Sequence, residues 1–255
     1  MLARLWPQDN RTVWQRRATA PPIGASDLIW DILEGPAPVI GQPVSAVIVL
    51  AGVTRGDGLH LNTGLAQAGC NLAQRLGVRA VVASSQAVYG RAAGRLSETD
   101  VAVPATPYGQ AKHEMEQAIS HLPDVTCLRI GNVAGADGMF SAMAQGPVRL
   151  DQFADGRAPQ RMMIGPRDLA AVLVGLCQTQ QPLPKLLNTA RPNLIGMDDL
   201  AQATGVQWSW QPAPDTALPE LAMDVSALMD IVPLPPTTAT DLMVQARDGG
   251  WQVAR

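Results

Sequence analysis

Three residues in the middle of the chain, Ser85, Tyr108 and Lys112, have side chains suited to proton transfer. Tyr108 and Lys112 are four residues apart, so on a helix they share one face. A phenol with a pKa of about 10 is a poor acid or base at neutral pH, but a nearby lysine cation favours the phenolate. A serine hydroxyl can hydrogen-bond the same substrate oxygen. Together the three groups suit proton movement at a carbinol or carbonyl while hydride passes to or from a nicotinamide.

The spacing Tyr-x-x-x-Lys is a weak signal alone, because any amphipathic helix can carry it on a solvated face. Its position along the chain strengthens it. Residues 50–52 (LAG), Ser85 and Asn132 each follow an apolar run closely. Open parallel sheets bind ligands beyond the carboxyl ends of their strands, so we expect these residues to border one crevice.

The apolar runs predict strands that alternate with helices. Short, valine-rich runs fit strands covered on both faces, and the helical stretches carry apolar residues at helical spacing. Gly77 stands where a helix end is expected. The predicted strands are 46–50, 80–83 and 125–130, and the predicted helices are 61–76 and 108–121. This order predicts an α/β fold with a doubly wound parallel sheet.

After about residue 140 the pattern changes to clustered prolines and loops, with a helical stretch at 168–177. We interpret residues 1–140 as a cofactor-binding core. Residues 141–255 form a mixed segment with a small substrate-binding cap and returning core elements. Trp208 and Trp210, in VQWSW, predict a late strand whose tryptophans pack within the cap.

Composition limits the function classes. The chain has 255 residues, 47% of them hydrophobic, and a formal net charge of −3, which argues against nucleic acid as the main partner. It contains no apolar run of the ~20 residues that a membrane helix needs. Its start has no signal-peptide h-region. The three widely spaced cysteines, Cys70, Cys127 and Cys177, predict reduced thiols in the cytoplasm, and the scattered histidines predict no metal site.

Three stretches carry a family resemblance. Residues 81–90 (VVASSQAVYG), 107–112 (PYGQAK) and 128–135 (LRIGNVAG) resemble the extended short-chain dehydrogenase/reductases, and within them the NAD(P)-dependent epimerase/dehydratase family. The likeness extends beyond residue 190. It implies a Rossmann-like core with NAD or NADP as cofactor.

The same resemblance assigns roles. It implies that Ser85, Tyr108 and Lys112 are catalytic, that Tyr108 and Lys112 also contact the cofactor, with Lys112 binding the nicotinamide ribose, and that Asn132 lies near the nicotinamide and the substrate. The LAG stretch Leu50, Ala51, Gly52 resembles the strand end beside the cofactor.

Further along, Asn62 resembles the asparagine that opens the next helix, and Asp168 the aspartate that begins a helix of the cap. A homodimer through the helices that include residues 61–76 and 108–121 is compatible with the family.

The chain departs from the family at its start. The family begins with a strand and a Gly-x-x-Gly-x-x-Gly turn that holds the pyrophosphate at a helix N-terminus. Nothing comparable precedes Met1; residues 1–7 resemble the tail of that first helix, and residues 12–15 the second strand. Arg16 and Arg17 then either accept the 2′-phosphate of NADP or form a solvated charge pair.

Residues 28–33 (LIWDIL) resemble the third strand, which would place Asp31 near the adenine. Without the family, Ser26 as an N-cap favours a helix here. Both alternatives remain open.

The missing strand has a physical consequence. In the doubly wound order the first strand is central, so the second and fourth strands would lose their shared partner. Either the polypeptide starts upstream of Met1, or the chain has a distorted sheet and weak or absent cofactor binding. We favour the first explanation because every other family segment is present in order; the intact mass of the natively expressed protein tests it.

The sequence supports two alternative functions. One is an NAD(P)-dependent oxidoreductase or epimerase/dehydratase that acts on a polar small molecule of the nucleotide-sugar kind; the short cap fits a simple reductase equally well. The other is a non-catalytic binding or regulatory protein of the same fold. The absent glycine loop favours the second, and the presence of Ser85, Tyr108 and Lys112 favours the first.

Overall fold

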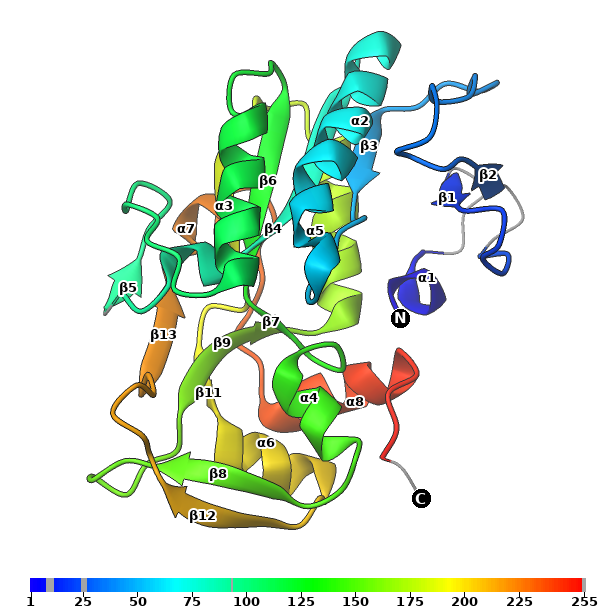
Figure 1. Cartoon of the computed structure of the whole chain (residues 1–255). Coiled ribbons are helices and arrows are strands. Elements are labelled where there is room, and N and C mark those ends of the chain that lie inside the picture. Colours follow the sequence, from blue (N-terminus) through cyan, green and yellow to red (C-terminus); the bar gives the residue numbers. More distant parts are fainter. Residues whose placement is uncertain (8–11, 24–26, 93, 254–255) are drawn as a thin grey trace.

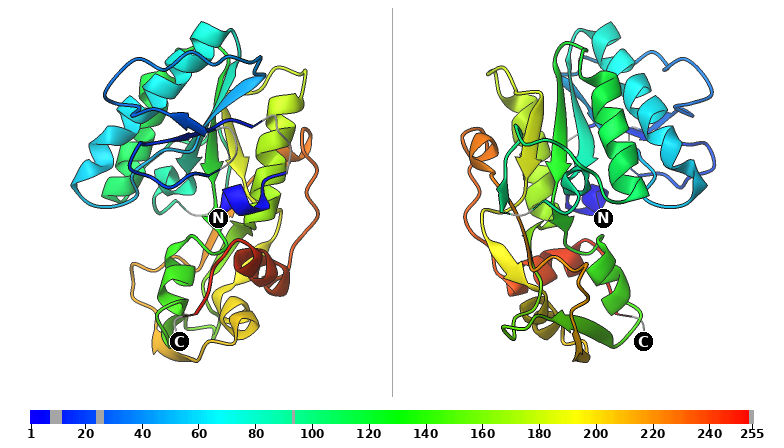
Figure 2. Two further views of the ribbon diagram at one scale, coloured as in Figure 1. Left: turned by 90° about the vertical axis from the view of Figure 1, so that its right-hand side faces the viewer. Right: turned by 60° about the vertical axis from the view of Figure 1, so that its left-hand side comes forward.

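The computed structural model describes residues 1–7, 12–23, 27–92 and 94–253. A layered α/β core lies above a smaller cap in Figure 1, and Figure 2 shows the same two parts from two other sides. Within the described ranges, no helix combines the length and apolar character needed to cross a membrane. Ser26, on which the helix alternative depended, lies outside these ranges.

The α-helices are α1 (Leu2–Leu5), α2 (Leu61–Leu76), α3 (Pro107–Ile119), α4 (Gly138–Met143), α5 (Pro166–Gln178), α6 (Met197–Thr204), α7 (Ser226–Met229) and α8 (Ala239–Asp248). The strands are β1 (Trp14–Arg16), β2 (Asp27–Ile29), β3 (Ala46–Val49), β4 (Arg79–Ser85), β5 (Arg95–Leu96), β6 (Val125–Ile130), β7 (Asn132–Val133), β8 (Val148–Gln152), β9 (Gln160–Ile164), β10 (Leu186–Thr189), β11 (Leu194–Gly196), β12 (Trp208–Pro212) and β13 (Glu220–Met223). Two 3₁₀ turns, η1 (Asp57–His60) and η2 (Gln86–Tyr89), follow β3 and β4.

The core sheet has the order β10-β6-β4-β3, with every neighbouring pair parallel. Its two faces are covered by different helices. Ala80 and Val82 pack with α2 and α3, whereas Val81 packs with α5, as the alternation of side chains along β4 requires. This arrangement confirms the predicted α/β class with helices on both faces of a parallel sheet.

The elements predicted from the apolar runs form where the sequence placed them. Helix α2 spans Leu61–Leu76 and ends at Gly77, whose φ of 67° is left-handed and suits a residue without a Cβ. Helix α3 begins one residue before Tyr108, because Pro107 fits the first turn and the Thr106 hydroxyl accepts from the backbone N–H of Gly109.

The first part of the chain is detached from this sheet. Strands β1 and β2 pair in parallel with each other, and among the described residues neither pairs with β3. The strand predicted at 28–33 is shorter, because β2 ends at Ile29 and a turn follows. The alternative of a helix here is wrong. The second and fourth strands of the family correspond to β1 and β3 here. Their separation is the one expected where no described strand pairs with both of them.

The cap is built mainly from segments after residue 132. Its sheet has the order β11-β9-β13-β5, with β7 beside β9, and β8 pairs with β12. Phe140 and Trp251 meet edge to face at 5.1 Å in its core. The strand predicted around Trp208 and Trp210 is confirmed as β12, and their rings pack edge to face at 4.7 Å.

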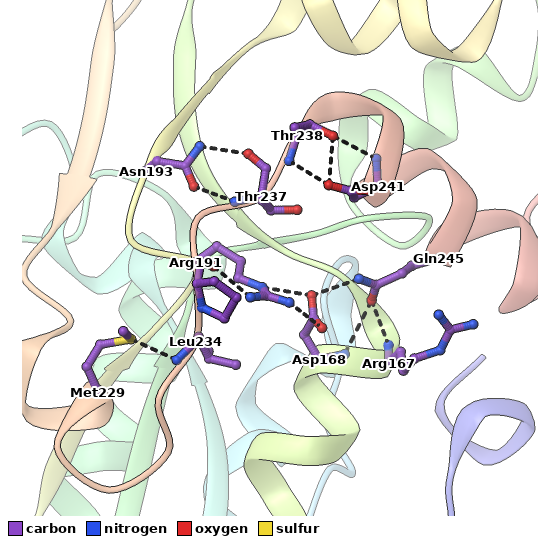
Figure 3. Close-up of polar contacts among 11 residues, drawn as sticks. Arg167, Asp168, Arg191, Asn193, Met229, Leu234, Thr237, Thr238, Asp241 and Gln245 are labelled. Atoms are coloured by element: carbon purple, nitrogen blue, oxygen red, sulfur yellow. Dashed lines mark hydrogen bonds and ion pairs between the residues drawn. The ribbon is translucent and has the colours of Figure 1, made fainter.

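Asp168 begins helix α5, but this helix covers a face of the core sheet, so its expected place in the cap is wrong. The buried Asp168 carboxylate joins three segments that are distant in the chain (Figure 3). Arg191 forms an ion pair with it at 2.6 Å, and Gln245 Nε2 donates to it at 2.8 Å. The Gln245 Oε1 atom accepts from the backbone N–H of Arg167 at 3.1 Å. This junction ties α5 to α8 and to the chain after β10.

Candidate active site

Ser85 and Tyr108 meet at the carboxyl end of the core sheet. Ser85 is the last residue of β4, and Tyr108 lies in the first turn of α3. Their side chains share a hydrogen bond. The Ser85 hydroxyl also accepts from the backbone N–H of Ala87 at 3.2 Å and so caps η2. The strand end and the capped helix therefore bring the two hydroxyls together.

Lys112 lies one turn further along α3 and is buried. Its Nζ atom donates to the Ala83 carbonyl of β4 at 2.8 Å. Burial lowers the pKa of Lys112 to about 8, although the negative charge of Glu116 acts in the opposite direction. The lysine is thus a desolvated cation near neutral pH, held against the strand that ends in Ser85.

The acidity of Tyr108 differs from the sequence-based expectation. Burial raises the pKa of Tyr108, and the hydrogen bond from Ser85 only partly offsets it. Lys112 is not among the groups that shift the pKa of Tyr108, and its Nζ atom donates to the Ala83 carbonyl. Tyr108 therefore stays protonated at neutral pH and is equipped to donate a proton.

The loop after β3 packs closely against Lys112. A Cβ on Gly52 would lie 3.2 Å from Lys112 Nζ and 2.9 Å from Asn62 Oδ1, so a side chain there would displace one of them. The buried Asn62 amide fixes this loop by bonding both backbone groups of Val53, at 3.1 and 2.9 Å. Gly52, the last residue of the LAG stretch, is thus held beside Lys112, and the expected position of the stretch beside the cofactor stays a prediction.

Asn132 is linked to two residues that sequence reasoning missed. Gln86, which directly follows Ser85, donates to Asn132 Oδ1. The Asn132 Nδ2 atom in turn donates to Asp137 Oδ2 at 2.8 Å. Burial raises the pKa of Asp137, and the carboxylate caps α4 through the N–H of Phe140 at 2.8 Å. An aspartate three residues before a helical phenylalanine is an N-cap signal that could have identified Asp137.

A buried ion pair between α3 and β6 stabilises the helix that carries Tyr108 and Lys112. Glu116, one turn beyond Lys112 on α3, contacts Arg129 of β6 at 2.8 Å. The Ser84 hydroxyl donates to Glu116 at 2.6 Å, and the Arg129 guanidinium lies 4.7 Å from the ring centroid of Tyr89. Burial lowers the pKa of Arg129, but the hydrogen bond and charge of Glu116 outweigh it and raise that pKa overall. This network fixes α3 against β4 and β6.

The structure does not bring Arg16 and Asp31 to Tyr108. Arg16 Nε pairs with Asp27 at 2.8 Å, and its Nη1 donates to the Ala20 carbonyl at 2.9 Å. Arg16 is therefore partly buried and ion-paired, and its expected contact with a 2′-phosphate stays a prediction. The Asp31 carboxylate accepts from the backbone N–H of Leu33 at 3.4 Å in the turn after β2.

The lowered pKa of Lys112 predicts a pH-dependent stability. Between the folded value of about 8 and the ordinary value of 10.5, the unfolded chain holds the Lys112 proton more often than the folded chain, so the contribution of Lys112 to the free energy of unfolding should rise with pH across this window. The buried cysteines Cys70, Cys127 and Cys177, whose pKa values burial raises, act in the opposite direction and are shared by the wild type and the variants, so the comparison between them isolates the lysine. Lys112→Met should remove that rise. Urea unfolding at several pH values across this window measures it.

The exposed Lys185 is the matched control, because its pairing with the Leu122 carbonyl lies at the surface. Lys185→Met should keep the rise of the wild type. An equal rise in Lys112→Met and in the wild type would contradict the burial of a charged amine at position 112.

Comparison with known proteins identifies the central part of the chain. Residues 42–166 match the model of the NAD dependent epimerase/dehydratase family. These residues are similar to that family. The matched segment runs from just before β3 to the start of α5 and includes Ser85, Tyr108, Lys112 and Asn132. No curated protein matches the chain.

Solved structures of epimerase/dehydratase enzymes share the fold over most of their length. MoeE5 in complex with UDP-glucuronic acid and NAD superposes with a TM-score of 0.71 at 22% identity, covering 93% of this chain and 90% of that one. The NAD dependent NDP-hexosamine 5,6-dehydratase TunA gives 0.67 at 19% identity, with 90% and 85% covered. UDP-glucuronic acid 4-epimerase from Bacillus cereus gives 0.66 at 16%, with 88% and 80% covered. The chain therefore has the Rossmann-like fold of these enzymes.

Proposed function

We propose that the chain is an NAD(P)-dependent enzyme that moves a proton and a hydride at a carbinol or carbonyl carbon of a polar small molecule. The observation that carries the proposal is the hydrogen bond between Ser85 and Tyr108 beside the buried Lys112. Three groups with these chemistries at one strand end fit proton exchange with a substrate oxygen. A purely structural role would not require a desolvated lysine next to two hydroxyls.

The residues present fit the nicotinamide half of the cofactor. Gly52 lets the loop after β3 approach Lys112 closely, since a Cβ at this position would lie 3.2 Å from Lys112 Nζ. Leu50, Ala51, Gly52, Tyr108, Lys112 and Asn132 are the residues that would hold this half. When bound, a nicotinamide supplies the hydride donor or acceptor. The described residues include no counterpart of the family's glycine-rich turn between first strand and first helix, so they assign no residues to the pyrophosphate.

Tyr108 and Ser85 have different roles in the proton transfer. Tyr108, protonated at neutral pH, exchanges its proton with the substrate oxygen, and the Ser85 hydroxyl hydrogen-bonds the same oxygen. Lys112, one turn beyond Tyr108 on α3, would bind the nicotinamide ribose through its buried ammonium. Glu116 and Arg129 keep α3 in position.

The ligands of the structural neighbours suggest the substrate class. MoeE5 was solved with UDP-glucuronic acid and with UDP-glucose. We infer that nucleotide sugars are the first substrates to test, and UDP-glucose and UDP-glucuronic acid form the test panel below.

A second candidate is a non-catalytic binding or regulatory protein of this fold. The engagement of Asn132 by Gln86 and Asp137 favours it. Titration of NADH and NADPH into the protein distinguishes the two. Saturable binding supports the enzyme. If neither the chain of residues 1–255 nor the natively expressed protein binds either cofactor, the non-catalytic role is the one that remains.

A further inference from the structure

A chain of hydrogen bonds crosses the ends of β4 and β6 directly beside Ser85. It consists of Gln86, Asn132 and Asp137, which we call the amide relay. Gln86 Nε2 donates to Asn132 Oδ1, and Asn132 Nδ2 donates to Asp137 Oδ2 at 2.8 Å. Strands β4 and β6 pair as far as Ser85, the last residue of β4. The amide relay therefore borders the strand end that carries the candidate active site.

The charge of Asp137 fixes the direction of the amide relay. Burial raises the pKa of Asp137, but the hydrogen bonds from Phe140 and Asn132 favour its ionised form. An ionised carboxylate only accepts hydrogen bonds, so Asn132 must direct its Nδ2 atom toward it. Asn132 Oδ1 then faces Gln86 and requires a donor, which is Gln86 Nε2. The amide relay consequently ends in Gln86 Oε1, which is an acceptor.

Gln86 Oε1 lacks a donor within the protein. This atom is buried and has no hydrogen-bond partner among the described residues. Nearly all buried polar atoms are paired, because an unpaired one loses its hydration without compensation. Gln86 as a whole is only partly buried, which leaves it within reach of a molecule bound beside Ser85. We therefore expect the missing donor to come from a ligand.

The charges around the amide relay favour a neutral donor. A hydroxyl group can donate to Gln86 Oε1, whereas a carboxylate is itself only an acceptor. No cation is among the groups that shift the pKa of Asp137. The ammonium of Lys112 donates to the Ala83 carbonyl instead. A second carboxylate beside Gln86 would thus be desolvated near the negative charge of Asp137 without a counter-charge, which is unfavourable.

We propose that Gln86 determines the substrate specificity of this site. Its Oε1 atom accepts a hydrogen bond from a hydroxyl of the sugar's exocyclic group, and the amide relay disfavours a carboxylate there. The inference rests on the proposed function and narrows its substrate class to neutral nucleotide sugars. In the test panel, UDP-glucose carries a hydroxymethyl group where UDP-glucuronic acid carries a carboxylate. The chain should therefore prefer UDP-glucose.

Calorimetry of both sugar nucleotides on the natively expressed protein, in the presence of NADH, tests this preference. The two ligands share the UDP part, so the ratio of their dissociation constants reports on the exocyclic group alone. We expect UDP-glucose to bind at least about tenfold more tightly, a difference of ~1.4 kcal/mol. This readout is binding and does not require turnover.

Substitutions of Gln86 test whether its amide causes the preference. Gln86→Met keeps the length of the side chain and removes the acceptor, so the two dissociation constants should come within about twofold of each other. Gln86→Lys places a cation there, and the preference should reverse toward UDP-glucuronic acid. Gln202, an exposed residue of α6, is the matched control. Gln202→Met should keep the preference of the wild type.

Asp137→Asn tests the direction of the amide relay without changing Gln86. Asparagine is as good an N-cap as aspartate, so α4 should keep its cap and the melting temperature should change little. The new amide can donate to Asn132 as well as accept from it, so the amide relay loses its fixed direction and its negative charge. The preference for UDP-glucose should weaken. A merely structural role of Asp137 would leave the ratio unchanged.

Four results would overturn the proposal: equal affinity of the wild type for both ligands, tighter binding of UDP-glucuronic acid, binding of neither, or an unchanged ratio in Gln86→Met. If the Gln86 variants fail to fold, the wild-type ratio and Asp137→Asn still decide. The predicted ratio in a protein that turns over neither ligand would support the specificity of Gln86 and contradict the proposed enzymatic function. The two claims can therefore fail separately.

Discussion

Replacing Tyr108 with phenylalanine should lower turnover by about 10²–10⁴-fold, the usual contribution of a positioned acid–base group. The substitution keeps the ring and removes only the hydroxyl that is hydrogen-bonded to Ser85. Because Tyr108 is only partly buried, the fold should be retained. Most of the loss should appear in kcat, since the hydroxyl acts on the reacting oxygen and contributes little to overall binding.

The measurement is turnover of the UDP-glucose and UDP-glucuronic acid panel with NAD(P), alongside the melting temperature. Tyr89, the other tyrosine of the chain, is the matched control. Its hydroxyl lies 2.8 Å from Asn188 Oδ1, away from Ser85, so Tyr89→Phe should cost about 1 kcal/mol of stability and leave turnover unchanged. Equal turnover in Tyr108→Phe and the wild type would show that Tyr108 is only a helix residue.

Replacing Arg129 with alanine should destabilise the protein by about 3–5 kcal/mol, because it leaves the buried Glu116 carboxylate without its cation. Ser84 and Glu116 hold α3 against β4, so the loss should also loosen the helix that carries Tyr108 and Lys112. For a chain of this length we expect the melting temperature to fall by ~10 °C. Urea unfolding measures the free energy directly.

Two controls separate the buried pair from charge removal in general. The double variant Arg129→Met, Glu116→Leu should recover most of the stability, because apolar residues can replace a buried ion pair. Arg157→Ala, which breaks an exposed ion pair with Asp155, should leave the unfolding midpoint unchanged. A loss in Arg157→Ala equal to that in Arg129→Ala would contradict the account of the buried pair.

The sequence predicts the core well for a local physical reason. The runs at β3, β4 and β6 are short and valine-rich, and α2 ends at a glycine whose left-handed φ the structure requires. Strands buried on both faces leave such continuous runs. The position of Tyr108 at the start of α3 follows equally from Thr106 and Pro107.

Other features depend on distant partners and could not be predicted. Glu116 pairs with Arg129, and Gln86 bonds Asn132 46 residues further along the chain. Among the described residues, β1 and β2 pair only with each other and not with β3, which periodicity does not reveal. The pKa of Tyr108 depends on burial and on the hydrogen bond with Ser85, and neither is local in sequence.

The measurement that tests the central claim most directly is a titration of NADH and NADPH into the natively expressed protein and into residues 1–255. The fluorescence of the cofactor reports binding. The account predicts saturable binding by the native protein that Lys112→Met weakens at least about tenfold, ~1.4 kcal/mol, because this buried ammonium lies beside Gly52 where the nicotinamide ribose would be held. Lys185→Met should bind as the wild type does. Absence of binding from both forms, or equal affinity in the two lysine variants, would contradict the assignment of a nicotinamide site to Tyr108 and Lys112.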